Sequence, residues 1–221
     1  MLNPNRMRSC VAMKLRSGTR EQPVAQEVLR QFGIVVEGDV VAQPATGVSA
    51  HLIEDTTNNF HGVAQNFQAP GPMTVALQAW LKSTDRQAGF DIIDSAGSGA
   101  RVYFDLATNE VYANYVHGTG FAIYNLAIEG PGPNGWWTCS ASIDLTPISA
   151  EHTFRIMIDK DKSGGQAYPG DGASFVQVWQ PSLTEDGGQN LLISPDDLTD
   201  PAWTAFGATV QNFPDDVLPT P

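Results

Sequence analysis

Positive charge is scarce in this sequence. Its 221 residues include 12 Lys and Arg against 24 Asp and Glu, so the formal net charge is −12. Five of the basic residues lie within positions 1–20, which contain no acidic residue, so the remainder of the chain carries −17. A body of this charge is repelled by nucleic acid and by anionic membranes. We therefore expect no nucleic-acid partner.

Cysteine and long apolar runs are also scarce. Only Cys10 and Cys139 are present, too few for the disulfide framework of a small secreted protein. No apolar run reaches the length of a membrane span, and positions 1–20 lack the apolar core of a signal peptide. We expect a protein that is made in a cytosol and does not insert into membranes.

Motifs of common enzyme classes are missing as well. There is no G-x-S-x-G elbow, no H-E-x-x-H and no glycine-rich phosphate loop. The four histidines, His51, His61, His117 and His152, show no metal-ligand spacing. We predict a non-enzymatic protein, although a pair of glycosidase carboxylates would meet only in the fold and stays open as an alternative.

Glycine, proline and short alternating apolar runs are present in quantity. There are 21 Gly and 15 Pro, which is typical of many turns between short strands. Apolar residues alternate with polar ones in 73–82, 101–106 and 152–159. Further strand candidates are 33–41, 49–55, 89–94, 110–116, 121–128, 135–143 and 173–180. About ten strands indicate an all-β, antiparallel sandwich of the jelly-roll kind, with a closed barrel as the alternative.

Three parts of the chain are expected from these patterns. Residues 1–32 form a basic N-terminal arm that ends in one short helix, because Val24, Val28 and Phe32 share a helical face in 21–32. Residues 33–188 form the jelly-roll sandwich. Residues 189–221 form an irregular C-terminal tail, in which prolines restrict continuous strand to roughly 203–213.

Four segments carry a resemblance to a known family. They are AHLIED (50–55), YFDLATN (103–109), GWWTCS (135–140) and VWQPSLTEDGG (178–188). Together they resemble the carbohydrate-binding-module-like jelly rolls of bacteriophage tail fibres, tailspikes and other virion proteins. NLLISPDDLTDPAW (190–203) is similar to the element that opens such a module, although here it follows the domain.

A glycan site is expected on the strand 135–143. Alternation places Trp136, Thr138 and Ser140 on one face of this strand. An aromatic ring beside hydroxyl groups suits a sugar, whose apolar face stacks while its own hydroxyls form hydrogen bonds. The alternative is that Trp136 packs inside the protein.

A calcium site is a second candidate, in DKDKSGG (159–165). Asp159, Asp161 and Ser163 have the spacing of the first half of a calcium loop, with a glycine at the sixth position. The twelfth position is Gly170 instead of glutamate, so the alternative is a solvated polar turn. Calcium is the sole cofactor considered.

Assembly residues are expected at both ends of the chain. The basic residues Arg6, Arg8, Lys14 and Arg16 would anchor the arm to an acidic neighbour, and Leu191, Leu192, Trp203 and Phe206 give the tail apolar surface. The tail is therefore expected to dock. It would cover an edge of its own sandwich, join a neighbouring subunit, or remain as a remnant of a tandem array.

The function that the resemblance implies is structural. We expect a non-enzymatic bacteriophage virion protein, as a head fibre, decoration protein or tail-fibre component that assembles in the host cytoplasm. Its partners would be capsid or tail proteins, further copies of itself in an oligomer such as a trimer, and a host surface glycan. A glycan-binding adhesin and a glycan-degrading enzyme are the alternatives.

Overall fold

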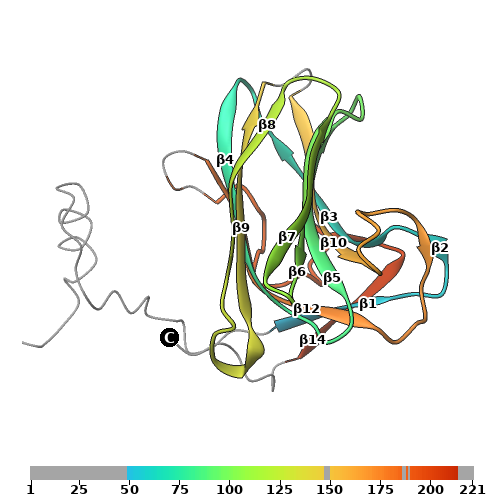
Figure 1. Ribbon diagram of the computed structural model, residues 1–221. Helices are drawn as coiled ribbons and strands as arrows, with labels where there is room; N and C mark the ends of the chain where they lie inside the picture. Colours follow the sequence, from blue (N-terminus) through green and yellow to red (C-terminus); the bar gives the residue numbers. More distant parts are fainter. Residues whose placement is uncertain (1–48, 147–149, 186–187, 189, 214–221) are drawn as a thin grey trace, which may run out of the picture. The chain divides into compact units, whose positions relative to one another are not determined.

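A computed structural model describes residues 49–146, 150–185, 188 and 190–213 (Figure 1). The expected basic arm, the helix over 21–32 and the strand over 33–41 lie outside these residues. Cys10 and the four basic assembly residues lie outside them too. Within the described ranges, no helix is long and apolar enough to cross a membrane.

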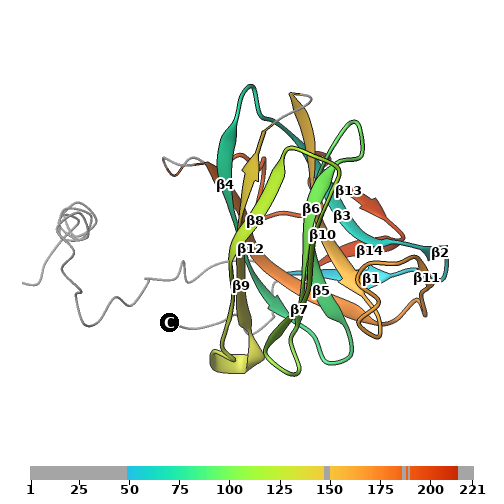
Figure 2. The ribbon, with the colours of Figure 1, turned by 45° about the horizontal axis from the view of Figure 1, so that its top comes forward.

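The described chain forms two six-stranded antiparallel sheets that face each other (Figures 1 and 2). Sheet one has the order β14 (Ala208–Phe213), β1 (Ser49–Glu54), β12 (Phe175–Glu185), β4 (Met73–Lys82), β9 (Trp137–Leu145) and β8 (Phe121–Glu129). Sheet two has the order β13 (Thr204–Phe206), β3 (His61–Gln68), β10 (Glu151–Asp159), β5 (Gln87–Asp94), β6 (Gly99–Asp105) and β7 (Glu110–His117). A small ribbon pairs β2 (Asn58–Asn59) with β11 (Tyr168–Pro169). The predicted all-β antiparallel sandwich is confirmed.

The core lies between the sheets and follows the alternation read from the sequence. On β4, Val75, Leu77, Ala79 and Leu81 are buried, whereas the residues between them face outward. From β10, Phe154 meets Phe90 of β5 with ring centroids 6.0 Å apart. Alternating strands bury one face each, and burial of such side chains contributes about 25 cal/mol per Å² of apolar area.

Strand β3 was not among the predicted strands. Its inward positions include a polar residue, Gln65, between Val63 and Phe67. The Gln65 amide donates to the Ile193 carbonyl oxygen at 2.9 Å, and the Ile193 N–H donates to Gln65 Oε1 at 2.7 Å. A buried glutamine with both amide atoms paired is stable in the fold but interrupts the apolar alternation.

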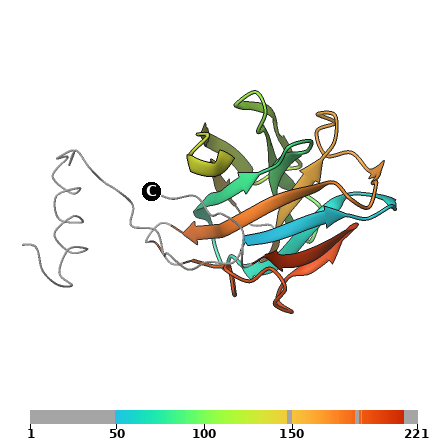
Figure 3. The ribbon, with the colours of Figure 1, turned by 90° about the horizontal axis from the view of Figure 1, so that it is seen from below.

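The C-terminal tail completes both sheets of its own sandwich. Strand β14 pairs with β1, and β13 pairs with β3. In Figure 3 the blue strand β1 lies between the orange β12 and the red β14. Leu192, Leu198 and Trp203 are buried in the core cluster. Of the three arrangements considered for the tail, the structure has the one in which it covers edges of its own sandwich.

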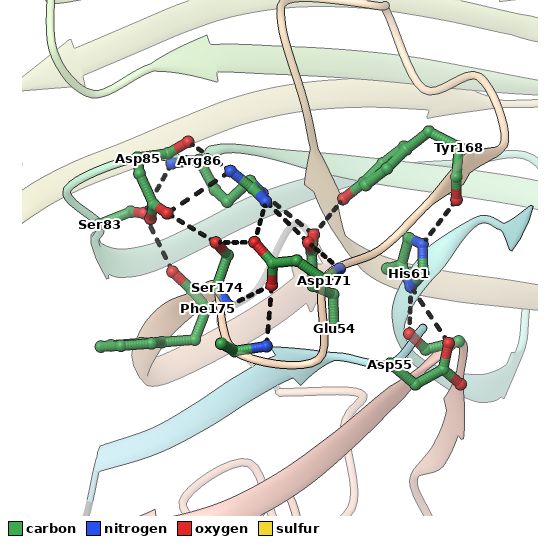
Figure 4. A network of polar contacts seen from close by, with 12 residues as sticks. Glu54, Asp55, His61, Ser83, Asp85, Arg86, Tyr168, Asp171, Ser174 and Phe175 are labelled. Atoms are coloured by element: carbon green, nitrogen blue, oxygen red, sulfur yellow. Dashed lines mark hydrogen bonds and ion pairs between the residues drawn. The ribbon is translucent and has the colours of Figure 1, made fainter. Parts of the chain in front are cut away.

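A polar network joins the end of β1 to two loops (Figure 4). The buried Glu54 carboxylate accepts hydrogen bonds from Arg86 Nε at 3.0 Å and Arg86 Nη2 at 2.7 Å. It also accepts from Tyr168 Oη at 2.8 Å and from the Asp171 N–H at 2.9 Å. These donors lower the pKa of Glu54 against the opposing effect of burial. The network thereby fixes the loops that precede β5 and β12.

Candidate functional site

The outer side of sheet one carries a continuous polar surface, here called the polar face. Its members are Thr74, Gln78 and Trp80 of β4, Tyr124 of β8, Thr138, Ser140 and Ser142 of β9, and Ser182 and Thr184 of β12. They alternate with buried residues such as Leu77 and Cys139, which point into the core. Four adjacent strands therefore present short polar side chains on one side.

Strand pairing places these side chains in cross-strand rows. Trp80 lies opposite Thr138, and Gln78 lies opposite Ser140. One row further, Ala76 lies opposite Ser142. Directly opposite residues on one face of an antiparallel pair are about 5 Å apart. The row of Ala76 therefore has a small side chain on β4.

Several groups on the polar face have no hydrogen-bond partner among the residues that the structure describes. The side chains of Gln78, Thr138 and Ser140 form no hydrogen bond within the described residues, and all three are half-buried or exposed. Hydroxyl and amide groups both donate and accept. The face therefore offers free donors and acceptors to a ligand.

Two aromatic rings stand in different rows of the polar face. Trp80 is half-buried and packs on Trp179 of β12, with ring centroids 6.2 Å apart. Tyr124 has 38% of its surface exposed, in the row of Ser142. The rows of Trp80 and Tyr124 differ by four residues along β4, which corresponds to about 14 Å.

Asp144 organises the end of the face near Tyr124. Its Oδ1 accepts hydrogen bonds from Thr74 Oγ1 at 2.6 Å and from Tyr124 Oη at 2.7 Å. These bonds lower the pKa of the Asp144 carboxyl, so it is ionised at neutral pH and suits an acceptor better than a general acid. A shallow hollow of about 570 Å³ adjoins it, lined by Pro72, Met73, Thr74, Asp144, Leu145, Thr146 and Glu185.

The structure brings two of the three predicted glycan residues to this face. Thr138 and Ser140 point outward from β9, but Trp136 is 0% exposed. Trp136 follows the 3₁₀ turn Pro133–Gly135 directly before β9, and the Lys82 ammonium lies over its ring at 5.8 Å from the centroid. Trp136 therefore has to be removed from the predicted site.

Trp80 supplies the ring that the sequence interpretation assigned to Trp136. It is the direct cross-strand neighbour of Thr138. The sequence MTVALQAWLK indicates this position, because Trp80 falls on the outward, more polar face of the alternating strand. Which strand pairs with β9 was not readable from the sequence, so the two residues were not connected.

The predicted calcium site also needs correction. Asp159 is buried, and its carboxylate accepts hydrogen bonds from Tyr112 and Ser163 and from the N–H groups of Gly164 at 3.0 Å and Gly165 at 3.3 Å. Asp161 is exposed. The ranges that the structure describes contain no group of three or more His, Cys, Asp or Glu that could hold a metal ion. Asp159 thus organises a polar loop by accepting its donors.

The apolar assembly residues of the tail serve the tail's own sandwich. Leu192 and Trp203 are buried, and Leu191 packs partly buried against the core. Phe206 is half-buried, and the Arg155 guanidinium lies over its ring at 5.8 Å from the centroid. A role of these side chains between subunits stays a prediction.

Comparison with known proteins gives a likeness to solved structures. No protein-family model matches the sequence, and no curated protein matches it. Among solved structures, a chain described as "PbXyn10C CBM APO", a carbohydrate-binding module, is 13% identical, with a TM-score of 0.43, over 86% of this chain and 99% of that chain. The sandwich assignment for this chain rests on its own strand pairing.

Proposed function

We propose that this chain is a non-catalytic glycan-binding module and that the polar face of sheet one binds a saccharide chain. The observation that carries the proposal is the set of unpartnered polar side chains, Gln78, Thr138 and Ser140, between two aromatic rings. The rings belong to Trp80 and Tyr124.

The chemistry of this face matches that of a sugar. A pyranose ring has an apolar face that stacks on an aromatic ring, and hydroxyl groups that both donate and accept hydrogen bonds. Hydroxyl and amide side chains have the same dual capacity, whereas charged side chains do not. The central rows of the polar face therefore suit an uncharged saccharide.

The dimensions of the face favour an extended ligand. The rows of its two rings are about 14 Å apart along the strand direction. The row between them consists of small or polar side chains, namely Ser182, Gln78, Ser140 and Ala127. We expect oligosaccharides to bind more tightly than the corresponding monosaccharides.

Binding to a neutral glycan array, followed by calorimetry with the best oligosaccharide, tests this function. Thr138→Val keeps the shape of the residue but removes a hydroxyl that bonds to nothing in the described residues. One hydrogen bond contributes about 0.5–1.5 kcal/mol, so affinity should fall roughly twofold to tenfold with no loss of stability. Tyr124→Ala should reduce affinity further by removing a stacking surface.

Thr204→Val is the matched control, because Thr204 is an exposed strand threonine on sheet two. If Thr138→Val and Tyr124→Ala both bind the oligosaccharide as tightly as the wild type does, the polar face is not the binding site. Release of reducing ends from the bound oligosaccharide would instead make the protein a glycan-degrading enzyme.

The setting in which the module acts is a bacteriophage particle, as a head fibre, decoration protein or tail-fibre component. Support for this part comes from the four sequence segments that resemble virion jelly rolls and from the basic N-terminal region beside an acidic body. Capsid or tail proteins and further copies of the chain are the partners, and a host surface glycan is the ligand.

Mass spectrometry of purified particles tests the virion setting, and light scattering on the full chain tests the oligomer. The protein should be retained on particles after washing in low salt and lost in high salt, because salt screens the charge interactions that would anchor the arm. Absence of the chain from washed particles would refute the virion setting without affecting the glycan-binding test.

A further inference from the structure

The outer side of sheet two carries one cross-strand row that crosses all six strands. The row, here called the arginine row, consists of Thr204, Ala64, Arg155, Asp91, Arg101 and Tyr115. It contains two guanidinium groups and one carboxylate, so one positive charge is unbalanced. An unbalanced cation in an acidic chain points to an anionic ligand.

Asp91 is shared between the two arginines. It is fully buried, and its Oδ2 accepts from Arg101 Nη2 at 2.9 Å and lies 3.4 Å from Arg155 Nη1. Within the described part of the chain, its other oxygen, Oδ1, has no hydrogen-bond partner, and neither has the buried Arg101 Nε. Buried polar atoms seldom lack a hydrogen-bond partner, and each exception requires a functional or structural explanation.

The two arginines differ in how much of their hydrogen-bonding capacity the protein uses. Arg101 also donates to Tyr115 Oη at 2.9 Å and to the Gly165 carbonyl oxygen at 3.3 Å. Its side chain is 12% exposed, against 28% for Arg155. Arg101 is therefore a structural residue of the row.

Arg155 retains free donors. Its hydrogen bonding within the described residues is limited to the long contact with Asp91, and its guanidinium rests over the ring of Phe206. A guanidinium has five N–H donors in a planar fork, which matches the two oxygens of a carboxylate. Ala64, its neighbour on β3, is too short to cover it. Arg155 can thus receive a carboxylate from solvent.

Aromatic rings are exposed at the other end of the arginine row. Tyr115 is 38% exposed and Phe60 39%, and the Arg101 guanidinium lies 5.5 Å and 6.0 Å from their ring centroids. Three strand spacings separate Arg155 from Tyr115, about 14 Å. A charged anchor and the Tyr115 ring therefore lie in one row of the sheet, and the Phe60 ring lies beside Arg101 of the same row.

We propose that the arginine row is a second saccharide site and that it binds an acidic glycan. A uronic-acid carboxylate pairs with Arg155, while another sugar of the same chain stacks on Tyr115 or Phe60. The site rests on the proposed glycan-binding function only in that its ligand is a saccharide. It lies on the opposite sheet from the polar face and shares no residue with it.

Calorimetry with oligogalacturonate and with the same oligomers after reduction of their carboxyl groups tests the site. Hydrogen bonds to charged groups are stronger than neutral ones, so reduction should weaken binding roughly tenfold to a hundredfold. Binding of the acidic form should also weaken at high salt. Oligomers of alginate and hyaluronate extend the test to other uronic acids.

Two variants locate the binding. Arg155→Gln removes the cation, and Ala64→Asp keeps it but places a competing carboxylate directly opposite. Each should weaken acidic-oligomer binding about as much as carboxyl reduction does. Ala64→Asp forms a favourable cross-strand pair, so it should fold even if Arg155→Gln is less stable.

The outcomes separate this site from the polar face. Thr138→Val should leave acidic-oligomer binding unchanged, and Ala64→Asp should leave neutral-glycan binding unchanged. The proposal is overturned if no uronic-acid oligomer binds the wild type, if carboxyl reduction has no effect, or if folded Ala64→Asp binds like the wild type.

Discussion

Trp203 offers a direct measure of how much the tail contributes to the sandwich. It is 6% exposed, and its ring lies edge-on to Phe154 with centroids 6.2 Å apart. Its indole Nε1 donates to the Ser194 carbonyl oxygen at 3.2 Å. Trp203→Ala would open a cavity beside Phe154 and remove that donor. Truncation of a buried tryptophan costs about 3–5 kcal/mol, so we expect a loss of about 4 kcal/mol in the free energy of unfolding.

Equilibrium urea unfolding of the full chain, followed by tryptophan fluorescence and by circular dichroism, measures this loss. With a slope of about 2 kcal/mol per M, the midpoint should fall by about 2 M. Ile193→Ala is the matched control in the same segment, because Ile193 is 62% exposed and its truncation should change stability by about 0.5 kcal/mol or less. A loss below about 1 kcal/mol for Trp203→Ala would show that the tail is not part of the core in solution.

Two further predictions concern buried charge. Glu54→Gln should lower the free energy of unfolding by about 3 kcal/mol, the lower end for breaking a buried ion pair. The loss is at the lower end because Arg86 keeps its ion pair with Asp171, at 2.9 Å. An unchanged urea midpoint would contradict this role of the network. Burial lowers the pKa of His152, against the opposing effect of Asp94, so the folded state favours the neutral imidazole. In the unfolded state the His152 imidazole has its ordinary pKa, near 6.5, so it is protonated at a higher pH than in the folded state. The free energy of unfolding should therefore fall as the pH decreases from 7.5 to 5.5. His152→Leu should reduce this pH dependence, and an equal dependence in both proteins would exclude His152 as its source.

The candidate site shows where sequence interpretation succeeded and where it stopped. Thr138 and Ser140 were placed outward because alternation within one strand is a local property of the backbone. Trp136 was misplaced because its side chain is buried, which alternation does not reveal, and the strand begins two residues later than expected. The role of Trp80 depends on the pairing of β4 with β9, residues about 60 positions apart, which no local pattern encodes.

The arginine row was missed for the same reason. Its six residues come from six strands, so no sequence window contains more than a small part of it. Arg155 and Arg101 each read as an ordinary outward residue of an alternating strand. Their unbalanced charge exists only because pairing places both beside the single carboxylate of Asp91.

By itself, the sequence determined that this protein is an all-β antiparallel sandwich, because period-two alternation and frequent turn residues act within a few positions of the chain. Only the tertiary structure decided where the tail lies, which ring stands beside Thr138 and which charges meet on sheet two. Those features depend on strand order and register, which follow from burial of the whole core and from hydrogen bonding between distant segments.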